Sequence, residues 1–209
     1  MPGAAWLTIA AVAVLVLGEQ RRSALLVRTS KPLASLGFVA TAWQLGALDH
    51  PIGRTLFIAL VLCAIGDLCL LSRAKAWFMA GLGAFLFGHI GYIVAFVQRG
   101  VSPVAVAVIA LVMTIPALVV WKWLRPHVEP AMRPAVLAYV ATITTMIACA
   151  WACMWPSGSM LVRVGASAFY LSDLSVARDV FIKPGFVNRA WGLPLYYGAQ
   201  LCIAASAAG

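Results

Sequence analysis

The chain has 209 residues, of which 64% are hydrophobic and 10% are charged, and its formal net charge is +9. With a mean hydropathy of +0.98, it lacks the polar surface that a soluble domain of this length needs. The basic residues form no stripe interleaved with aromatic side chains outside the apolar segments, so we expect no nucleic-acid partner.

The apolar segments predict membrane-spanning helices rather than the strands of a barrel. Only helices and closed barrels satisfy the backbone in lipid, and barrel strands alternate apolar and polar residues. The runs at 60–66 and 111–121 do not alternate. We therefore predict an all-α polytopic membrane bundle, a single domain over residues 1–209 with about eight transmembrane helices. In chain order the predicted spans are 4–18, 33–48, 52–72, 76–97, 102–124, 134–155, 160–179 and 190–207.

The segments between the spans are short and carry charges, prolines or glycines. None is long enough for a further domain, which favours one compact bundle. The predicted breaks lie at 19–31, 49–51, 73–75, 100–103, 125–134, 156–159 and 183–189.

The basic residues alternate between the two sides of the predicted bundle. Of the 15 lysines and arginines, all but Arg54, Arg99 and Arg163 fall at the breaks after the first, third, fifth and seventh spans. Because cytoplasmic loops are enriched in Lys and Arg, these breaks are expected in the cytoplasm and both termini outside. A bacterial cytoplasmic (inner) membrane is the expected location.

Two aspartates lie inside predicted spans, where a carboxylate costs about 2.5–3.5 kcal/mol on insertion scales. Asp67 is in the third span and Asp173 is in the seventh, each a few residues before a basic loop. At about 1.5 Å of rise per residue, both are expected at a similar depth in the cytoplasmic half of the membrane. Intramembrane carboxylates are functional candidates, although either aspartate could instead be a structural partner of an arginine or tyrosine.

Other polar residues are spaced so that they could share a cavity with these aspartates. His89 and Tyr92 lie three residues apart in the fourth span, and Tyr196 and Gln200 lie one turn apart in the eighth, so each pair shares a helix face. The plainer interpretation is that His89 is a hydrogen-bonded interhelical residue and that Tyr196 is a packing aromatic.

Two cations flank the predicted site on its cytoplasmic side. Lys31 enters the second span and Arg178 leaves the seventh, so both are candidates for binding a substrate, although simple positive-inside anchoring explains them equally well. Asp179 is expected to be a solvated loop charge.

Other site chemistries fit the sequence poorly. A zinc site needs several ligands at one depth, but only three histidines exist and two of them, His50 and His127, lie in breaks on opposite sides. The sequence has no GxSxG elbow, Walker A run or GxGxxG motif, which would indicate a serine hydrolase or nucleotide binding. We expect no metal and no cofactor, and chemistry that depends on carboxylates.

The order of these motifs resembles the YhhN family, the group that includes mammalian lysoplasmalogenases. The resemblance extends from Lys31 to Gln200. It rests on Lys31-Pro32-Leu33, Gly66-Asp67-Leu68, Phe85…His89…Tyr92, Gly165-Ala166…Phe169…Ser172-Asp173 and Tyr196-Tyr197…Gln200. It implies an eight-helix membrane protein that hydrolyses the vinyl ether bond of lysoplasmalogens, which are alkenyl-glycerophosphoethanolamines or -cholines, and releases a fatty aldehyde and a glycerophospho-base. Its partners would then be this lysophospholipid and membrane lipids.

The residues suit that chemistry. Vinyl ether hydrolysis needs an acid that protonates the alkene carbon and a second carboxylate that stabilises the resulting cation and activates water, as paired carboxylates do in glycosidases. Asp67 and Asp173 are therefore the predicted catalytic pair, in an order that the sequence leaves open. Lys31 and Arg178 are predicted to hold the phosphate, and His89, Tyr92, Tyr196 and Gln200 to position water or the glycerol hydroxyl.

Two other classes of function remain open at this point. The same intramembrane carboxylates could relay protons or bind a solute in a transporter or lipid-binding protein. No discontinuous helix is predicted near Asp67 or Asp173, which argues against transport. A non-catalytic scaffold would have no use for two buried acids.

Overall fold

The computed structural model describes residues 2–72, 74–153 and 160–207. Within these ranges the chain forms eight long helices and no β-strand. Their bounds are α1 (Gly3–Gln20), α2 (Ala24–Gln44), α3 (Pro51–Cys69), α4 (Lys75–Gln98), α5 (Pro103–Leu124), α6 (Arg133–Ala152), α7 (Met160–Ala177) and α8 (Phe186–Ala205). The predicted all-α bundle is confirmed. Arg73 and the predicted break at 156–159 lie outside the described residues.

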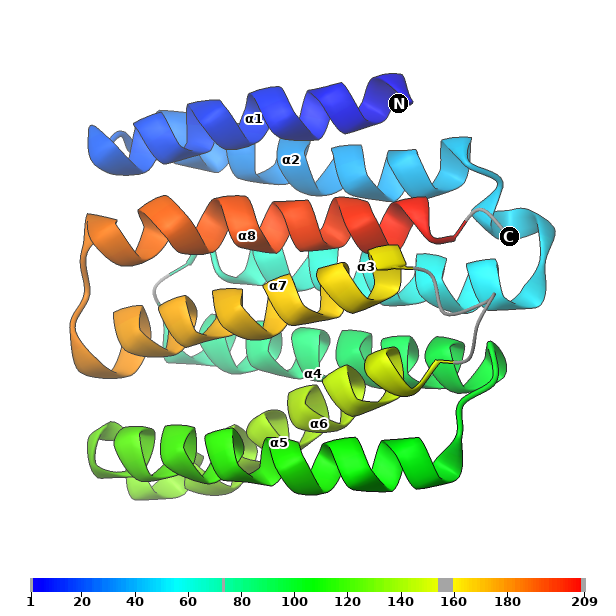
Figure 1. Ribbon diagram of the computed structural model, residues 1–209. Coiled ribbons are helices and arrows are strands. Elements are labelled where there is room, and N and C mark those ends of the chain that lie inside the picture. Colours follow the sequence, from blue (N-terminus) through cyan, green and yellow to red (C-terminus); the bar gives the residue numbers. More distant parts are fainter. Residues whose placement is uncertain (1, 73, 154–159, 208–209) are drawn as a thin grey trace.

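Helices adjacent in the chain form antiparallel pairs that lie side by side (Figure 1). In the view of Figure 1, α1 and α2 lie at the top, α8, α7 and α3 in the middle, and α4, α5 and α6 at the bottom. Helix α8 packs against α1, α2, α3 and α7, and α6 joins α4 to α7. The described ends of the chain lie at the same end of the bundle.

The outer surface of the bundle is apolar. Six of the helices are long and apolar enough to cross a membrane. On α5, Leu111 and Ile115 are 74% and 69% exposed, a surface that only a bilayer or another protein would cover. Helices α2 and α8 are less apolar because they bear the polar residues of the interior, but with 21 and 20 residues they are long enough to span. The chain is an integral membrane protein.

Local signals explain where the helices begin. Pro51 and Pro103 are the first residues of α3 and α5, where a missing N–H costs nothing. The Ser102 hydroxyl accepts a hydrogen bond from the Ala105 N–H at 3.3 Å, and the His50 ring does the same for Gly53 at 3.1 Å.

The predicted start of the second span was wrong. Helix α2 begins at Ala24, nine residues before the predicted boundary, and Pro32 lies inside it. The Ser23 hydroxyl caps the helix by accepting from the Leu26 N–H at 3.5 Å. Proline is tolerated within membrane helices, so Lys31-Pro32 does not mark a helix start. Lys31 consequently lies two turns inside α2.

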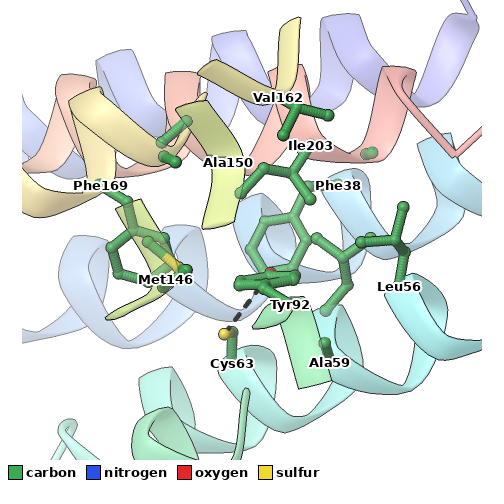
Figure 2. Close-up of a cluster of buried hydrophobic side chains, with 14 of the residues drawn as sticks. Phe38, Leu56, Ala59, Cys63, Tyr92, Met146, Ala150, Val162, Phe169 and Ile203 are labelled. Atoms are coloured by element: carbon green, nitrogen blue, oxygen red, sulfur yellow. Dashed lines mark hydrogen bonds between the residues drawn. The ribbon is translucent and has the colours of Figure 1, made fainter. Parts of the chain in front are cut away.

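A close approach between α3 and α4 positions the site. A Cβ atom added to Gly88 would lie 2.7 Å from Cys63 Sγ, and one added to Gly66 would lie 2.7 Å from the Phe85 ring. Small residues allow such contacts between membrane helices. Figure 2 shows Cys63 and Tyr92 within the main apolar core, with Phe38 and Phe169 nearby.

Candidate active site

Asp67 of α3 is in contact with polar groups from two other helices, α2 and α8. Its Oδ2 accepts hydrogen bonds from the Ser35 hydroxyl of α2 at 2.7 Å and from the Tyr196 hydroxyl of α8 at 2.8 Å. Lys31 Nζ of α2 lies 3.6 Å from Asp67 Oδ1. Asp67 itself is 3% exposed. A buried carboxylate needs partners of this kind, and here a cation and two hydroxyl donors supply them.

A chain of hydrogen bonds continues from Tyr196 towards the middle of the bundle. Gln200 Nε2 donates to the Tyr196 hydroxyl oxygen at 3.1 Å, and the Tyr92 hydroxyl donates to Gln200 Oε1 at 2.6 Å. The Tyr92 hydroxyl also lies 3.6 Å from Cys63 Sγ. Since Tyr196 accepts from Gln200, its own proton is directed at Asp67.

Tyr197 lies beside this cluster with longer contacts. Its hydroxyl is 3.4 Å from the Ser35 hydroxyl and 3.5 Å from the Lys31 carbonyl oxygen. It stacks edge-on against Tyr196, with 4.8 Å between ring centroids. Tyr197 therefore supports the shape of the cluster more than the charge of Asp67.

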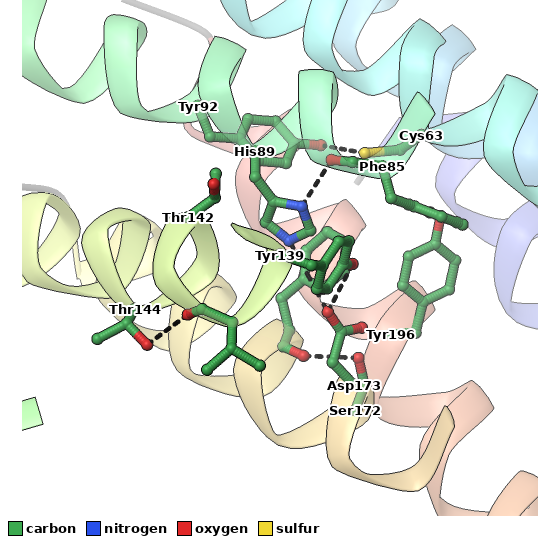
Figure 3. Close-up of polar contacts among 12 residues, drawn as sticks. Cys63, Phe85, His89, Tyr92, Tyr139, Thr142, Thr144, Ser172, Asp173 and Tyr196 are labelled. Atoms are coloured by element: carbon green, nitrogen blue, oxygen red, sulfur yellow. Dashed lines mark hydrogen bonds and ion pairs between the residues drawn. The ribbon is translucent and has the colours of Figure 1, made fainter. Parts of the chain in front are cut away.

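Asp173 belongs to a second cluster, built by α4, α6 and α7 (Figure 3). Its Oδ2 accepts a hydrogen bond from the Tyr139 hydroxyl at 2.7 Å and lies 4.0 Å from His89 Nε2. The side chain of Asp173 is 18% exposed. Among the described residues, no lysine or arginine nitrogen lies within 4.0 Å of its carboxylate.

The Phe85 backbone fixes the orientation of the His89 ring. His89 Nδ1 lies 2.6 Å from the Phe85 carbonyl oxygen, so in the neutral ring Nδ1 carries the proton and Nε2 presents a lone pair. His89 is 1% exposed, and in the described part of the chain its Nε2 has no hydrogen-bond partner. A buried nitrogen without a partner needs an explanation, and this one faces Asp173 across a gap longer than a hydrogen bond.

Aromatic rings connect the two clusters. The Phe169 ring lies 4.6 Å from the His89 ring and 5.2 Å from the Tyr196 ring, and the Phe85 ring lies 5.9 Å from Tyr196, all centroid to centroid. Apolar rings therefore lie next to Tyr196, which contacts Asp67, and next to His89, which faces Asp173. Carboxylates beside such rings suit a substrate that has a polar head and an apolar chain.

The structure brings most of the predicted site residues into one of the two clusters. The Asp67 cluster contains Lys31 and Tyr196, and hydrogen bonds connect Tyr196 to Gln200 and then Tyr92. The Asp173 cluster contains His89. Arg178 is separate. It lies in the π-helical turn Arg178–Ile182 that follows α7, and its Nη1 donates to Asn188 Oδ1 at 2.5 Å.

Three contacting residues were not assigned to the site from the sequence: Ser35, Tyr139 and Tyr197, of which Tyr197 was named only as part of the Tyr196-Tyr197…Gln200 motif. Ser35 lies one turn after Lys31 on α2, a spacing that would have suggested it. Tyr197 adjoins Tyr196, whereas no local pattern distinguishes Tyr139 in α6.

Asp179 differs from its prediction as a solvated charge. It lies 3.0 Å from Arg189 Nη2, and its side chain is 14% exposed. Arg189 also pairs with Glu19 at the end of α1. These contacts connect the α7–α8 turn to α1 at the end of the bundle where α1, α3, α5 and α7 finish, which we call the basic end. Asp179 is paired and largely buried there, so its prediction as a solvated charge was wrong.

Comparison with known proteins supplies a family. The model of the YhhN family matches residues 26–207. The chain is 32% identical over 186 residues to the protein named lysoplasmalogenase TMEM86A of Bos taurus, covering 84% of this chain and 75% of that one. It is 35% identical to lysoplasmalogenase TMEM86B of Homo sapiens over 149 residues, covering 71% and 61% of the two chains. It is 33% identical to lysoplasmalogenase of Mycobacterium bovis over 172 residues, covering 76% and 63%. No solved structure matches the chain.

Proposed function

The chain belongs to the YhhN family, and we propose that it is a membrane-embedded hydrolase that cleaves the vinyl ether bond of lysoplasmalogens. The names of its relatives support this substrate. The observation that carries the proposal is a pair of intramembrane aspartates with unlike surroundings. Asp67 faces Lys31 at 3.6 Å, whereas Asp173 faces a tyrosine hydroxyl and an imidazole nitrogen.

The reaction adds one water molecule and breaks one carbon–oxygen bond. An acid protonates the alkene carbon that is not bonded to oxygen, which leaves an oxocarbenium ion. Water adds to this cation and loses a proton, forming a hemiacetal. The hemiacetal collapses to a fatty aldehyde and the free hydroxyl of the glycerophospho-base. The enzyme must therefore supply one proton, stabilise one cation and accept one proton.

We assign the acid to Asp173 and the stabilising carboxylate to Asp67. Lys31 and the hydroxyls of Ser35 and Tyr196 favour a negative charge on Asp67. Within the described residues, Asp173 has one hydroxyl donor and no lysine or arginine nitrogen within 4.0 Å, an arrangement suited to a carboxyl group that carries a proton. Two carboxyl groups with different surroundings divide acid and base roles in the same way in other enzymes.

The neighbouring polar residues position the reactants in this proposal. His89 Nε2 has a free lone pair beside Asp173, so it is placed to orient the attacking water. Tyr92 and Gln200 hold the Tyr196 hydroxyl against Asp67. A substrate phosphate would lie near Arg178 and Lys31 at the basic end, with Lys31 shared between the phosphate and Asp67.

We further propose that the basic end faces the cytoplasm of a bacterial inner membrane, with both termini outside. Arg54, Arg99 and Arg163 lie near the opposite ends of their helices, and the other basic residues that the structure describes lie at the basic end. This asymmetry supports the orientation, and it would let a lysolipid enter from the cytoplasmic leaflet.

Mass spectrometry of purified protein incubated with a mixture of alkenyl, alkyl and acyl lysolipids tests the proposal. We expect aldehyde from the alkenyl species alone, and turnover reduced by about 10²–10⁴-fold in Asp67→Asn and Asp173→Asn. Asp49→Asn, at an exposed aspartate, is the matched control and should retain full activity.

Each other outcome would redirect the assignment. Free fatty acid from the acyl species would indicate an esterase. Solute uptake by proteoliposomes, with no product from any lysolipid, would favour transport. Near-normal turnover by one aspartate variant would remove that residue from the mechanism.

A further inference from the structure

A small groove lies between α4 and α6. Its volume is about 100 Å³, and half-buried residues line it: Met79, Leu82, Gly83 and Leu86 of α4, and Ala135 and Tyr139 of α6. A larger recess of about 400 Å³ lies near Trp43 and Asp49 and shares no lining residue with either aspartate cluster. Of these two recesses, the groove between α4 and α6 is the one that shares a lining residue, Tyr139, with an aspartate cluster.

Tyr139 connects this groove to Asp173. One side of Tyr139 lines the groove, and its hydroxyl donates to Asp173 Oδ2 at 2.7 Å. Figure 3 shows Tyr139 next to His89 and Asp173. His89 Nε2, buried and without a hydrogen-bond partner among the described residues, lies 4.0 Å from the same carboxylate. Tyr139 is thus shared between the lining of the groove and the cluster that contains the unsatisfied His89 nitrogen.

The size and lining of the groove restrict what it can hold. Apart from the Tyr139 hydroxyl, which is already bonded to Asp173, its lining side chains offer no polar group. Ligand pockets usually measure about 300–1,000 Å³, so this one accommodates only a segment of a hydrocarbon chain, with the remainder of the chain in the bilayer.

Gly83 makes the groove open. A Cβ atom added to Gly83 would meet no atom within 4 Å, so the space beside this residue is empty. The same helix packs closely elsewhere, because a Cβ at Gly81 would lie 3.1 Å from Leu70 Cδ2. Because Gly83 lines the groove and its Cβ position is open, a larger side chain at position 83 is expected to narrow the groove.

We infer that the α4–α6 groove binds the part of a single-chain lipid's hydrocarbon that adjoins its head, and that Gly83 and Ala135 set the width of the chain it admits. The inference rests on the proposed function for the identity of the lipid. The observation that carries the inference is that one residue, Tyr139, both lines the apolar groove and donates a hydrogen bond to Asp173.

Photolabelling tests the groove without requiring turnover. The probe is a saturated alkyl-ether lysophosphocholine with a diazirine in its chain near the glycerol, used with the full-length protein in lipid nanodiscs. Labelled peptides are mapped with and without excess unlabelled alkyl-ether lysophosphocholine. We expect the probe to label residues within 79–86 and 135–139, and the unlabelled lipid to reduce this labelling. The labelling should be lost in Gly83→Leu and retained in Gly198→Leu. Gly198 is exposed on α8, and a Cβ there also meets nothing within 4 Å.

Kinetics with alkenyl lysolipids give a second readout. Because one methylene in an apolar pocket changes specificity by about 10-fold or more, Gly83→Leu should raise KM at least about 10-fold for a long-chain substrate. Gly198→Leu, at an exposed position on α8 outside the groove, should leave the KM for the same substrate unchanged.

The outcomes separate the inference from the proposed function. Competed labelling in the groove without hydrolysis of any vinyl ether would support the groove and overturn the reaction. Competed labelling between other helices, labelling unaffected by Gly83→Leu, or no competed labelling at all would overturn the groove, whatever the turnover.

Discussion

His89 presents an unprotonated ring nitrogen to the carboxylate of Asp173. The Phe85 carbonyl oxygen, 2.6 Å from His89 Nδ1, sets the ring so that Nε2 lies 4.0 Å from Asp173 Oδ2. This nitrogen is buried and has no hydrogen-bond partner within the described residues. The backbone of α4 therefore orients an acceptor towards an acid, which is the arrangement that a bound water or a reacting substrate would complete.

Two substitutions of His89 distinguish the roles of its two ring nitrogens. In His89→Asn the amide can replace Nδ1 and keep the bond to Phe85, but nothing replaces Nε2. We expect kcat to fall about 10²-fold with little change in KM, measured as aldehyde release. His89→Gln places an amide oxygen near the position of Nε2 and should retain more activity. Equal losses in both variants would contradict a role for Nε2, and His127→Asn, at an exposed histidine, controls for general effects.

The adjacent residues Tyr196 and Tyr197 provide a matched pair of variants. Tyr196→Phe removes a 2.8 Å hydrogen bond to Asp67, whereas Tyr197→Phe removes longer contacts, of 3.4 Å to the Ser35 hydroxyl and 3.5 Å to the Lys31 carbonyl oxygen. Since a hydrogen bond to a charged group contributes about 1.5–3 kcal/mol, we expect kcat to fall about 10- to 100-fold in Tyr196→Phe. Tyr197→Phe should stay close to wild type. Similar losses in the two variants would argue against a specific role for the Tyr196 hydroxyl.

The sequence was sufficient to predict the architecture, and it singled out two aspartates inside the helices as candidates. Apolar runs and the alternation of basic loops predicted eight helices, because lipid imposes both patterns on any spanning chain. Asp67 and Asp173 stood out because carboxylates are rare at such positions. The start of α2 was misjudged because the local cap at Ser23 outweighed the proline at position 32.

The partners of the acids were harder to predict. Lys31, Tyr196 and Gln200 were selected from helix faces, and Ser35 would have followed from the same argument. Tyr139 carries no such signal, since its contact with Asp173 depends on how α6 packs between α4 and α7. Arg178 was chosen for its charge and depth, but its contact with Asn188 depends on the π-helical turn. A single cavity that reaches both aspartates stays a prediction.

The ion pair of Lys31 with Asp67 should contribute to stability as well as to activity. The two side chains are 12% and 4% exposed, and removing one partner of a buried pair costs about 3–5 kcal/mol. Lys31→Met should therefore lower the thermal unfolding temperature in detergent. Adding Asp67→Asn to the same protein should restore stability but not turnover.

An exposed ion pair supplies the control for this experiment. Lys75 and Glu129 are 61% and 55% exposed in their pair, and such surface pairs contribute less than about 1 kcal/mol. Lys75→Met should leave the unfolding temperature nearly unchanged. If Lys31→Met were no more harmful than Lys75→Met, Asp67 would not depend on Lys31 for its charge.

Two glycines of α4 should respond in opposite ways to alanine. At Gly88 the new methyl group would lie 2.7 Å from Cys63 Sγ and 3.3 Å from the Ala59 carbonyl oxygen, whereas at Gly83 it would meet nothing within 4 Å. Overpacking costs about 1–3 kcal/mol, so Gly88→Ala should lower the unfolding temperature, while Gly83→Ala should leave it unchanged or raise it through the better helix propensity of alanine. Because Gly88 precedes His89, the same displacement of α4 should also reduce turnover. Full activity and stability in Gly88→Ala would mean that α3 and α4 can separate without moving His89 from Asp173.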